Sequence, residues 1–459
     1  MNRHAAIRCL WLALAGTVLL RTPAAATPTD AQIARDADTY LQAHADAGSF
    51  SGTVLVARSG KVLFVKGYGF ADEQRQLRNG RATRFPIASI TKTFTATLVL
   101  QLQHSRLLSI DDPVCRHLAP CPAHWNAITL RHLLMHTAGI PDYAKDADFE
   151  QKRRLSRTRD QIIAGFRDRP LQFAPGARYS YSNSSYLVLA AVLERAGGKR
   201  YRRLLEERIL APLGMRDSGL EPTPASVPLA RGYRPDGASN APADPVDPAW
   251  LDAAGAMYST VDDLLRWDRA LAAGSLLPRE VLAAMWSPAL RKYGLGWQLE
   301  PPAAPLNRRL VFHAGGTTGF SSDFLRYPDE QVAIVVLANL MPVPLADVSR
   351  DLAAIVFGEK YSLPTVRHAL AVDPSIYDAY AGRYRLAPEI HIVVSRDGDR
   401  LIVQATGQSA DVAIPDSATT FFSRVSPVRL SFVKDGAGKV VRLVLHQPGR
   451  DLVAPRIAD

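Results

Sequence analysis

The strand-type segments between residues 51 and 339 constrain the fold most, because they lie at the two ends of that stretch. Two β-rich runs at 51–58 and 61–68 stand on either side of a Ser-Gly pair and predict a β-hairpin. Helical and turn-rich sequence follows, with a helix expected from about Thr91 to Leu108. Further strand-type runs come only later, at 293–299, 310–313 and 332–339. This order predicts a mixed α/β domain whose sheet is completed by distant parts of the chain.

The last part of the chain has a different pattern. After Tyr380, short β-type runs alternate with turn signals such as Asp-Gly pairs, which predicts a separate all-β domain, either a small barrel or a sandwich. The boundary is expected within 358–375, a stretch that contains two prolines. The predicted domains therefore cover 27–360 and 375–459. A chain of 459 residues that is 47% hydrophobic is long enough to form both cores.

The first residues predict a secretory signal peptide that covers 1–26. Arg3 and Arg8 precede twelve apolar residues from Cys9 to Leu20, and Ala24–Ala26 supplies a small-residue cleavage site. Twelve residues are too few for the ~20 that a membrane-spanning helix needs. We therefore expect an exported protein, periplasmic or secreted, whose mature form has no transmembrane anchor.

Export would leave Cys115 and Cys121 as the remaining cysteines. In an oxidising compartment this close pair favours a local disulfide, with two free loop thiols as the alternative. The formal charge of +11 comes from scattered basic residues. A basic pair such as Arg153-Arg154 could attract an anionic surface, but the scatter predicts solvated surface and no nucleic-acid partner.

Ser89 and Lys92 form an S-x-x-K motif at the entrance to the predicted helix. Positions three apart on a helix lie on one face, and a lysine in a dry pocket can have its pKa lowered far enough to deprotonate a serine. A second copy, Ser431 to Lys434, lies in a predicted strand, where positions three apart point to opposite faces. The sequence therefore favours Ser89 as a nucleophile.

Two further motifs carry candidate residues. Tyr181 and Asn183 are two apart in an extended loop, where a phenol whose pKa is lowered by a neighbouring ammonium could shuttle protons and an amide could orient the lysine. His313, Gly315 and Gly316 lie on a late strand, where the glycines would let a substrate backbone approach and a backbone N–H could bind an oxyanion. A histidine in such a strand can equally be a satisfied structural residue.

The order S-x-x-K, Y-x-N and a strand triplet ending in glycine resembles class C β-lactamases and penicillin-binding-protein-like serine hydrolases, a group that includes D-amino-acid peptidases and carboxylesterases. The resemblance covers roughly 51–339 and includes FPIASITKTFTATLVLQL, ITLRHLLMHTAGI and HAGGTTGFSS. It implies a β-lactamase/transpeptidase-like α/β domain with a mainly antiparallel sheet flanked by helices, plus a helical region. The tail resembles a small lipocalin-like β-domain that some members carry.

The resemblance also implies roles for individual residues. Ser89 would be the nucleophile, Lys92 and Tyr181 the base and proton shuttle, and Asn183 the group that orients them. Backbone N–H groups of Ser89 and Gly316 would form the oxyanion hole. No metal or organic cofactor is implied, and His132 and His136 do not form H-E-x-x-H, because Leu133 occupies the glutamate position.

One departure from the family pattern bears on the substrate. His313-Ala314-Gly315 stands where relatives that bind a substrate carboxylate usually have Lys-Thr-Gly. A neutral imidazole and a methyl group hold a carboxylate poorly, unless an arginine from elsewhere substitutes. The sequence thus favours a carboxylesterase-like serine hydrolase acting on a small-molecule or short-peptide substrate. D-amino-acid peptidase, class C β-lactamase and a binding or scaffold protein without turnover remain alternatives, and a homo-oligomer is left open.

Overall fold

The computed structural model describes residues 27–220, 229–288, 290, 292–303, 305–426, 428–447 and 449–457. The predicted signal peptide at 1–26 lies outside these residues. Among the residues described, every helix is too short or too polar to cross a lipid bilayer.

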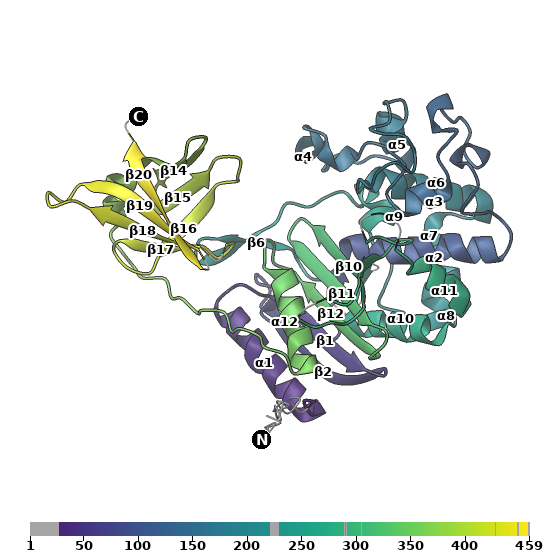
Figure 1. Cartoon of the computed structure of the whole chain (residues 1–459), viewed down its shortest axis with the longest axis horizontal. Helices are drawn as coiled ribbons and strands as arrows, with labels where there is room; N and C mark the ends of the chain where they lie inside the picture. Colours follow the sequence, from purple (N-terminus) through teal and green to yellow (C-terminus); the bar gives the residue numbers. More distant parts are fainter. Residues whose placement is uncertain are drawn as a thin grey trace, which may run out of the picture.

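A six-stranded sheet forms the centre of the first part of the chain (Figure 1). Its strands run in the order β2-β1-β12-β11-β10-β9, and all neighbours are antiparallel. The strands are β1 (Gly52–Arg58), β2 (Lys61–Tyr68), β9 (Gln298–Glu300), β10 (Leu310–Thr317), β11 (Phe320–Tyr327) and β12 (Val332–Ala338). The predicted hairpin is confirmed, and β1 pairs with β12, so distant parts of the chain complete the sheet.

The late strands differ from the prediction in two places. The run at 293–299 is mostly loop, with β9 restricted to Gln298–Glu300, and β11 was not predicted at all. Strand β11 carries Ser322 and Asp323 toward buried partners, so its sequence lacks the apolar pattern of a core strand. Tertiary hydrogen bonds, which no local pattern reports, make these polar residues acceptable in the core.

The sheet separates two hydrophobic cores. Alternate residues of β1 face opposite sides, with Val54 and Val56 in one core and Leu55 and Ala57 in the other. Helices α1 (Asp30–Asp46) and α12 (Leu345–Phe357) cover the first face and lie side by side (Figure 1). The helical region covers the second face, and it contains α2 (Thr91–His104), α6 (Asn183–Gly197), α9 (Asp252–Gly255) and α10 (Val261–Ala273).

Helix α2 lies in the middle of the second core. Every residue from Thr91 to Leu100 is buried, so the helix is enclosed on all sides rather than along the one apolar face that the sequence suggested. Its Phe94 ring stacks on Trp267 of α10 at 4.3 Å. A helix that packs on all sides holds its first turn, and therefore Ser89 and Lys92, in a fixed position.

The C-terminal part forms a closed antiparallel β-barrel, as an all-β domain would (Figure 1). Its strands are β13 (Gly382–Ala387), β14 (Ile390–Asp397), β15 (Arg400–Ala405), β16 (Asp411–Pro415), β17 (Thr420–Phe422), β18 (Arg429–Lys434), β19 (Val440–Gln447) and β20 (Arg450–Ile457). The barrel has its own core, which includes Tyr384, Phe421 and Phe432. Residues 359–373, between α12 and the barrel, form neither helix nor strand.

Candidate active site

A tight turn positions Ser89 at the entrance of α2. Ser89 lies in the short 3₁₀ helix η1 (Ala88–Ile90), and Ala88 adopts a φ of 44°, a left-handed conformation that costs free energy for a non-glycine residue. Hydrogen bonds hold this turn: Ile87 N donates to Met257 O at 2.8 Å, and Thr91 Oγ1 donates to Ala88 O at 2.7 Å. The Ser89 side chain is consequently presented at a fixed point above the helix.

The Lys92 side chain is fully buried beneath Ser89. Its Nζ donates to Ser89 Oγ at 3.0 Å, to Asn183 Oδ1 at 2.9 Å and to Ala254 O at 2.7 Å. Burial lowers the pKa of Lys92 to about 7, against a smaller opposing effect of the Asp142 carboxylate. Near neutral pH a substantial fraction of Lys92 is therefore the free amine, which can accept a proton.

Tyr181 contacts Ser89 from the other side. Its Oη donates to Ser89 Oγ at 2.8 Å, and the Lys92 Nζ lies 4.8 Å from the centre of its ring. Burial raises the pKa of Tyr181, although the hydrogen bond to Ser89 acts in the opposite direction. The expectation that a neighbouring ammonium lowers this pKa was wrong, because desolvation of the phenolate outweighs the attraction of the cation. Tyr181 is thus a phenol that donates a hydrogen bond.

Asn183 begins α6 and bridges Lys92 to a buried carboxylate that the sequence analysis did not single out. Its Oδ1 accepts from Lys92, while its Nδ2 lies 3.3 Å from Asp142 Oδ1 and its backbone N donates to the same oxygen at 3.1 Å. Burial raises the pKa of Asp142. Asp142 fixes which way the Asn183 amide points, and its only sequence signal was its place just after the family-like segment ending at Ile140.

Strand β10 passes close to the Ser89 turn at Gly315. A Cβ atom on Gly315 would lie 2.4 Å from Ile87 O, 2.4 Å from Ser322 Oγ and 3.0 Å from Ser89 N. Gly315 therefore serves the packing of the strand against the turn, not the approach of a substrate as the sequence analysis supposed. A Cβ on Gly316 would meet only Met341 Cε, at 3.4 Å, and Gly316 lines the cavity that contains Ser89.

His313 is turned away from that cavity. It is 1% exposed, its Nε2 lies 2.9 Å from Tyr293 Oη, and its Nδ1 lies 2.7 Å from Ala314 O. Tyr293 Oη is also 3.3 Å from His136 Nε2, whose Nδ1 accepts from Ser182 N. Burial lowers the pKa of His313 to about 3, so the imidazole is neutral at physiological pH. His313 is a satisfied structural residue that supports the loop carrying Tyr181.

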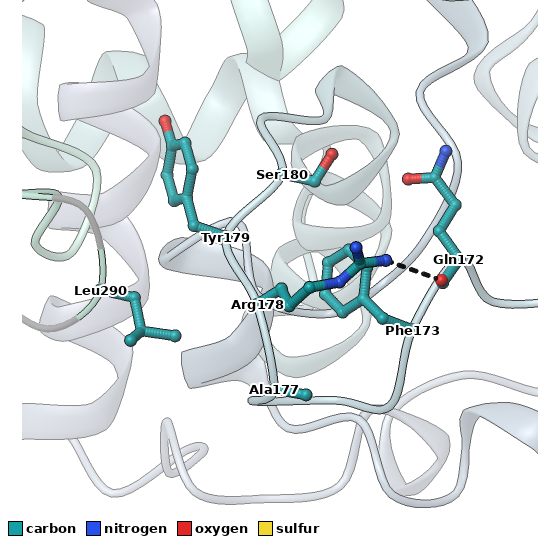
Figure 2. Close-up of a pocket in the computed structure, with 7 residues that line it drawn as sticks. All are labelled: Gln172, Phe173, Ala177, Arg178, Tyr179, Ser180 and Leu290. Carbon is teal, nitrogen blue, oxygen red and sulfur yellow. Dashed lines mark hydrogen bonds between the residues drawn. The ribbon is translucent and has the colours of Figure 1, made fainter.

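The cavity at Ser89 has a volume of about 260 Å³. It brings together Ser89, Tyr181, Asn183 and Gly316, and its wall also includes Phe149, Arg153, Leu251 and Thr318. A second cavity of about 500 Å³ lies beside the loop that precedes Tyr181 (Figure 2). Figure 2 shows Tyr179 and Leu290 on one side of it and Arg178 over the Phe173 ring on the other. Tyr179 also packs 5.8 Å from Tyr293, so this cavity lies toward His313.

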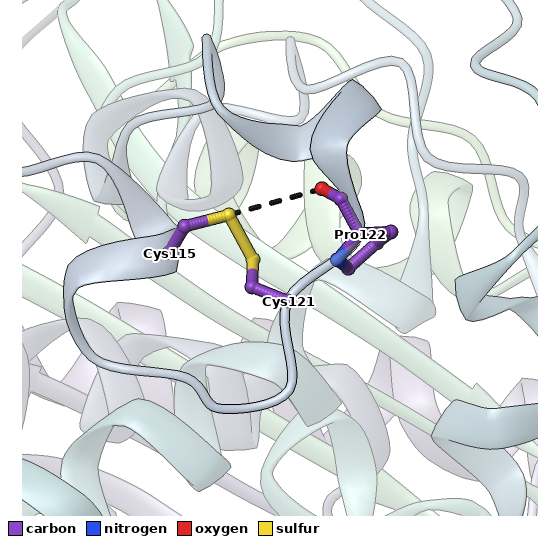
Figure 3. Close-up of a disulfide and its surroundings, with 3 residues drawn as sticks. All are labelled: Cys115, Cys121 and Pro122. Atoms are coloured by element: carbon purple, nitrogen blue, oxygen red, sulfur yellow. Dashed lines mark hydrogen bonds between the residues drawn. A yellow bond between two sulfur atoms is a disulfide. The ribbon is translucent and has the colours of Figure 1, made fainter.

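Two remaining sequence predictions concern cysteines and a second serine. The structure joins Cys115 and Cys121 by a disulfide that closes a loop after η2 (Val114–Arg116), with Cα atoms 5.3 Å apart (Figure 3). In the second S-x-x-K copy, Ser431 Oγ contacts His446 Nε2 at 2.8 Å, whereas the Lys434 Nζ lies over the Tyr380 ring. Ser431 and Lys434 point to different partners, as a strand requires.

The histidine pair that the sequence analysis set aside makes structural contacts. His132 Nδ1 accepts from Thr129 N at the start of α3 (Leu130–Leu134), and His136 supports Ser182 and Tyr293. Among the residues that the structure describes, there is no cluster of three or more His, Cys, Asp or Glu side chains able to hold a metal ion.

Comparison with known proteins gives the following similarities. The Beta-lactamase family matches residues 37–357, and a domain of unknown function (DUF3471) matches residues 367–455. Penicillin-binding protein 4* of Bacillus subtilis (strain 168) is 29% identical over 435 residues, which cover 89% of this chain and 95% of that protein.

Two solved structures resemble the fold. An octameric penicillin-binding protein homologue from Pyrococcus abyssi aligns with a TM-score of 0.65 at 23% identity, covering 91% of this chain and 99% of that chain. A D-stereospecific amidohydrolase from Streptomyces sp. aligns with a TM-score of 0.60 at 29% identity, covering 72% of this chain and 100% of that chain.

Proposed function

The chain belongs to the β-lactamase family, and from that premise we propose that it is a serine hydrolase that cleaves ester or amide bonds through an acyl-enzyme on Ser89. The observation that carries this proposal is the position of Ser89 Oγ, 3.0 Å from Lys92 Nζ and 2.8 Å from Tyr181 Oη. A nucleophile in contact with both a base and a proton donor is what acyl transfer requires.

In the proposed acylation, the neutral amine of Lys92 accepts the Ser89 proton while Ser89 Oγ bonds to the substrate carbonyl carbon. The carbonyl oxygen becomes an oxyanion that the backbone N–H groups of Ser89 and Gly316 stabilise. When the intermediate collapses, Tyr181 gives its proton to the leaving oxygen or nitrogen and receives the one that Lys92 accepted. The raised pKa of Tyr181 supports this role, because no phenolate persists between steps.

Deacylation repeats these steps with water as the nucleophile. Lys92 accepts a water proton, hydroxide adds to the acyl carbon, and the C–O bond to Ser89 breaks as Ser89 Oγ regains a proton. Asn183 and Asp142 keep the Lys92 amine aimed at Ser89 throughout, because their hydrogen bonds fix the amide that accepts from Lys92. The step therefore needs no group outside those described.

We propose that short acyl esters are better substrates than β-lactams. Ala314, exposed on β10, offers no side-chain donor, and His313 is buried, neutral and bound to Tyr293. A β-lactam carboxylate at that end of β10 would lack two charge-assisted contacts, worth ~1.5–3 kcal/mol each. That loss corresponds to about two to four decades in kcat/KM. A neutral ester needs neither contact.

A D-amino-acid amidase or peptidase is the second candidate. The similarity to a D-stereospecific amidohydrolase at 29% identity favours it. An amide differs from an ester in that its nitrogen must be protonated to leave, and Tyr181, protonated at neutral pH, is a suitable donor.

We also propose that residues 1–26 are removed on export and that 27–360 and 375–459 are two domains, the second lipocalin-like. The Cys115–Cys121 disulfide supports an oxidising compartment, since such bonds are rare in the cytosol. The closed barrel with its own core supports the division.

The test compares kcat/KM for p-nitrophenyl butyrate, a D-aminoacyl p-nitroanilide and nitrocefin on one preparation. We expect the ester to exceed nitrocefin by roughly 10²-fold or more. A fluorophosphonate probe should label Ser89, and Ser89→Ala should lose both labelling and turnover. Nitrocefin turnover equal to that of the ester would restore a β-lactamase, and labelling that maps to Ser431 would contradict the nucleophile. A labelled protein that turns over no substrate would indicate a binding protein.

A further inference from the structure

Arg153 lies in the wall of the Ser89 cavity and takes no part in the proposed mechanism. It follows helix α4 (Phe149–Lys152) and is only 7% exposed. The sequence analysis treated Arg153 and Arg154 as one basic surface pair, which is wrong for Arg153. Arg154 is exposed and pairs with Asp244 at 2.5 Å, whereas Arg153 points inward.

The Arg153 guanidinium keeps donors free. Its Nε donates to Glu150 Oε2 at 2.7 Å and its Nη1 donates to Thr318 Oγ1, while its Nη2 has no hydrogen-bond partner in the part of the chain that the structure describes. The Glu150 side chain is 75% exposed, so it compensates the charge from the solvent side. Buried guanidinium N–H groups are normally paired, and those of Arg153 adjoin an open cavity.

The position of Thr318 relates Arg153 to the reacting bond. Thr318 comes two residues after Gly316, or roughly 7 Å along an extended chain. It lies on the opposite side of Gly316 from His313 and from the second cavity beside Tyr179. A substrate lying along β10 with its carbonyl at Ser89 would therefore extend one end toward Arg153 and the other toward the Tyr179 cavity.

We propose that Arg153 and Thr318 bind a carboxylate carried by the acyl portion of the substrate, three to four bonds from the carbonyl that Ser89 attacks. This inference rests on the proposed function and narrows its substrate class to esters or amides of short dicarboxylic acids. Arginine pairs with a carboxylate through two parallel N–H bonds, which the unpaired Nη2 and a remaining Nη1 hydrogen can supply. The leaving group then departs toward the Tyr179 cavity.

The other described residues of the cavity wall leave few rivals for this role. Apart from Arg153 and Glu150, the wall is neutral and includes the apolar Phe149, Val246 and Leu251. Apolar surroundings strengthen a charge-assisted hydrogen bond because water competes less. An acyl carboxylate would thus meet one buried cation, with the exposed Glu150 on that cation's far edge.

The test uses two p-nitrophenyl esters of matched length, the mono-ester of glutaric acid and the ester of pentanoic acid. We expect kcat/KM of the wild-type protein to be about 10- to 100-fold higher for the glutarate ester, as one bidentate charge-assisted contact would give. Arg153→Gln should abolish this preference and leave kcat/KM for the pentanoate ester within about threefold. Thr318→Val, which keeps the cation but removes one of its anchors, should reduce the preference severalfold.

Arg154→Gln is the matched control, since it removes an adjacent arginine that is exposed and paired to Asp244. It should keep the full preference for glutarate. Equal kcat/KM for the two esters in the wild type would overturn the inference and leave the serine hydrolase intact. A loss in Arg153→Gln that is the same for both esters would show a structural role instead. Preference for a matched aminoacyl ester would indicate that Glu150 binds an ammonium. Absence of ester turnover together with absence of Ser89 labelling would refute the proposed function itself.

Discussion

The Lys92 amine has a hydrogen-bond arrangement that depends on its charge. As an ammonium it donates to Ser89, Asn183 and Ala254, which uses all three protons. As a free amine it keeps two protons for Asn183 and Ala254 and turns its lone pair toward Ser89. Burial brings the pKa of Lys92 to about 7, and this value places the exchange between the two arrangements in the physiological range.

This exchange predicts the pH dependence of activity. Below about pH 7 the ammonium has no lone pair to accept the Ser89 proton, so kcat/KM should rise with pH through a single ionisation near 7. Tyr181, whose pKa is raised, should add no falling limb below pH 9. The measurement is kcat/KM for p-nitrophenyl butyrate between pH 5 and 9. Lys92→Ala and Tyr181→Phe should each lower kcat by ~10²-fold or more, and Lys92→Ala should also remove the limb. A limb that persists in Lys92→Ala would assign the base to another group.

The contact between strand β10 and the turn η1 determines how closely Gly316 can approach Ser89. Gly315 has no side chain at the point where the strand passes Ile87 O and Ser322 Oγ, and Ser322 Oγ itself donates to Ile87 O at 2.8 Å. Neighbouring strand and turn are therefore locked in register by one small residue and one hydrogen bond. The oxyanion hole is a property of this contact between two elements rather than of either element alone.

Gly315→Ala tests that contact. A Cβ placed 2.4 Å from the Ile87 carbonyl must push the strand from the turn, and overpacking of this kind costs ~1–3 kcal/mol. We expect a lower melting temperature together with a fall of at least ~10-fold in kcat/KM. Gly165→Ala is the control, because Gly165 is exposed on α5 (Arg159–Arg167) and a Cβ there meets nothing within 4 Å. Activity in Gly315→Ala equal to that of the wild type would show that the close approach is not needed.

The barrel contacts the first part of the chain chiefly through polar groups. Arg424 donates to the backbone oxygens of Gly48, at 2.7 Å, and Ser239, at 2.6 Å, and Arg400 pairs with Asp236. The three hydrophobic cores are separate, and neither core of the first part includes a residue beyond Tyr361. Polar contacts of this kind add little to stability compared with a shared apolar core.

A chain ending at Gly358 should therefore fold. Its near-UV circular dichroism should remain native-like and its melting temperature should fall by about 5 °C or less, since only surface contacts are lost. Arg424→Ala in the full chain is the matched control, because it removes the main contact while keeping the barrel. If the truncated protein is insoluble or lacks near-UV signal while Arg424→Ala is normal, the barrel is required for folding of the first part.

Local spacing was sufficient to predict several features of this protein. The hairpin of β1 and β2 follows from two β-rich runs around a short turn, and the meeting of Ser89 with Lys92 follows from one helical turn. The same reasoning separated Ser431 from Lys434, since a strand sends them to different partners. In each case the residues are near in sequence, so backbone geometry alone fixes their relation.

Features that depend on distant contacts were beyond such reasoning. The pKa of Tyr181 is raised by burial that many elements create together, and His313 is turned from the cavity by Tyr293 and His136. Arg153 looked like half of a surface pair until Thr318, 165 positions away, was found bonded to it. Burial and long-range pairing exist only once the chain has closed on itself. The sequence therefore determined which groups could react, and the tertiary structure decided their charge, their direction and which of them share the cavity with Ser89.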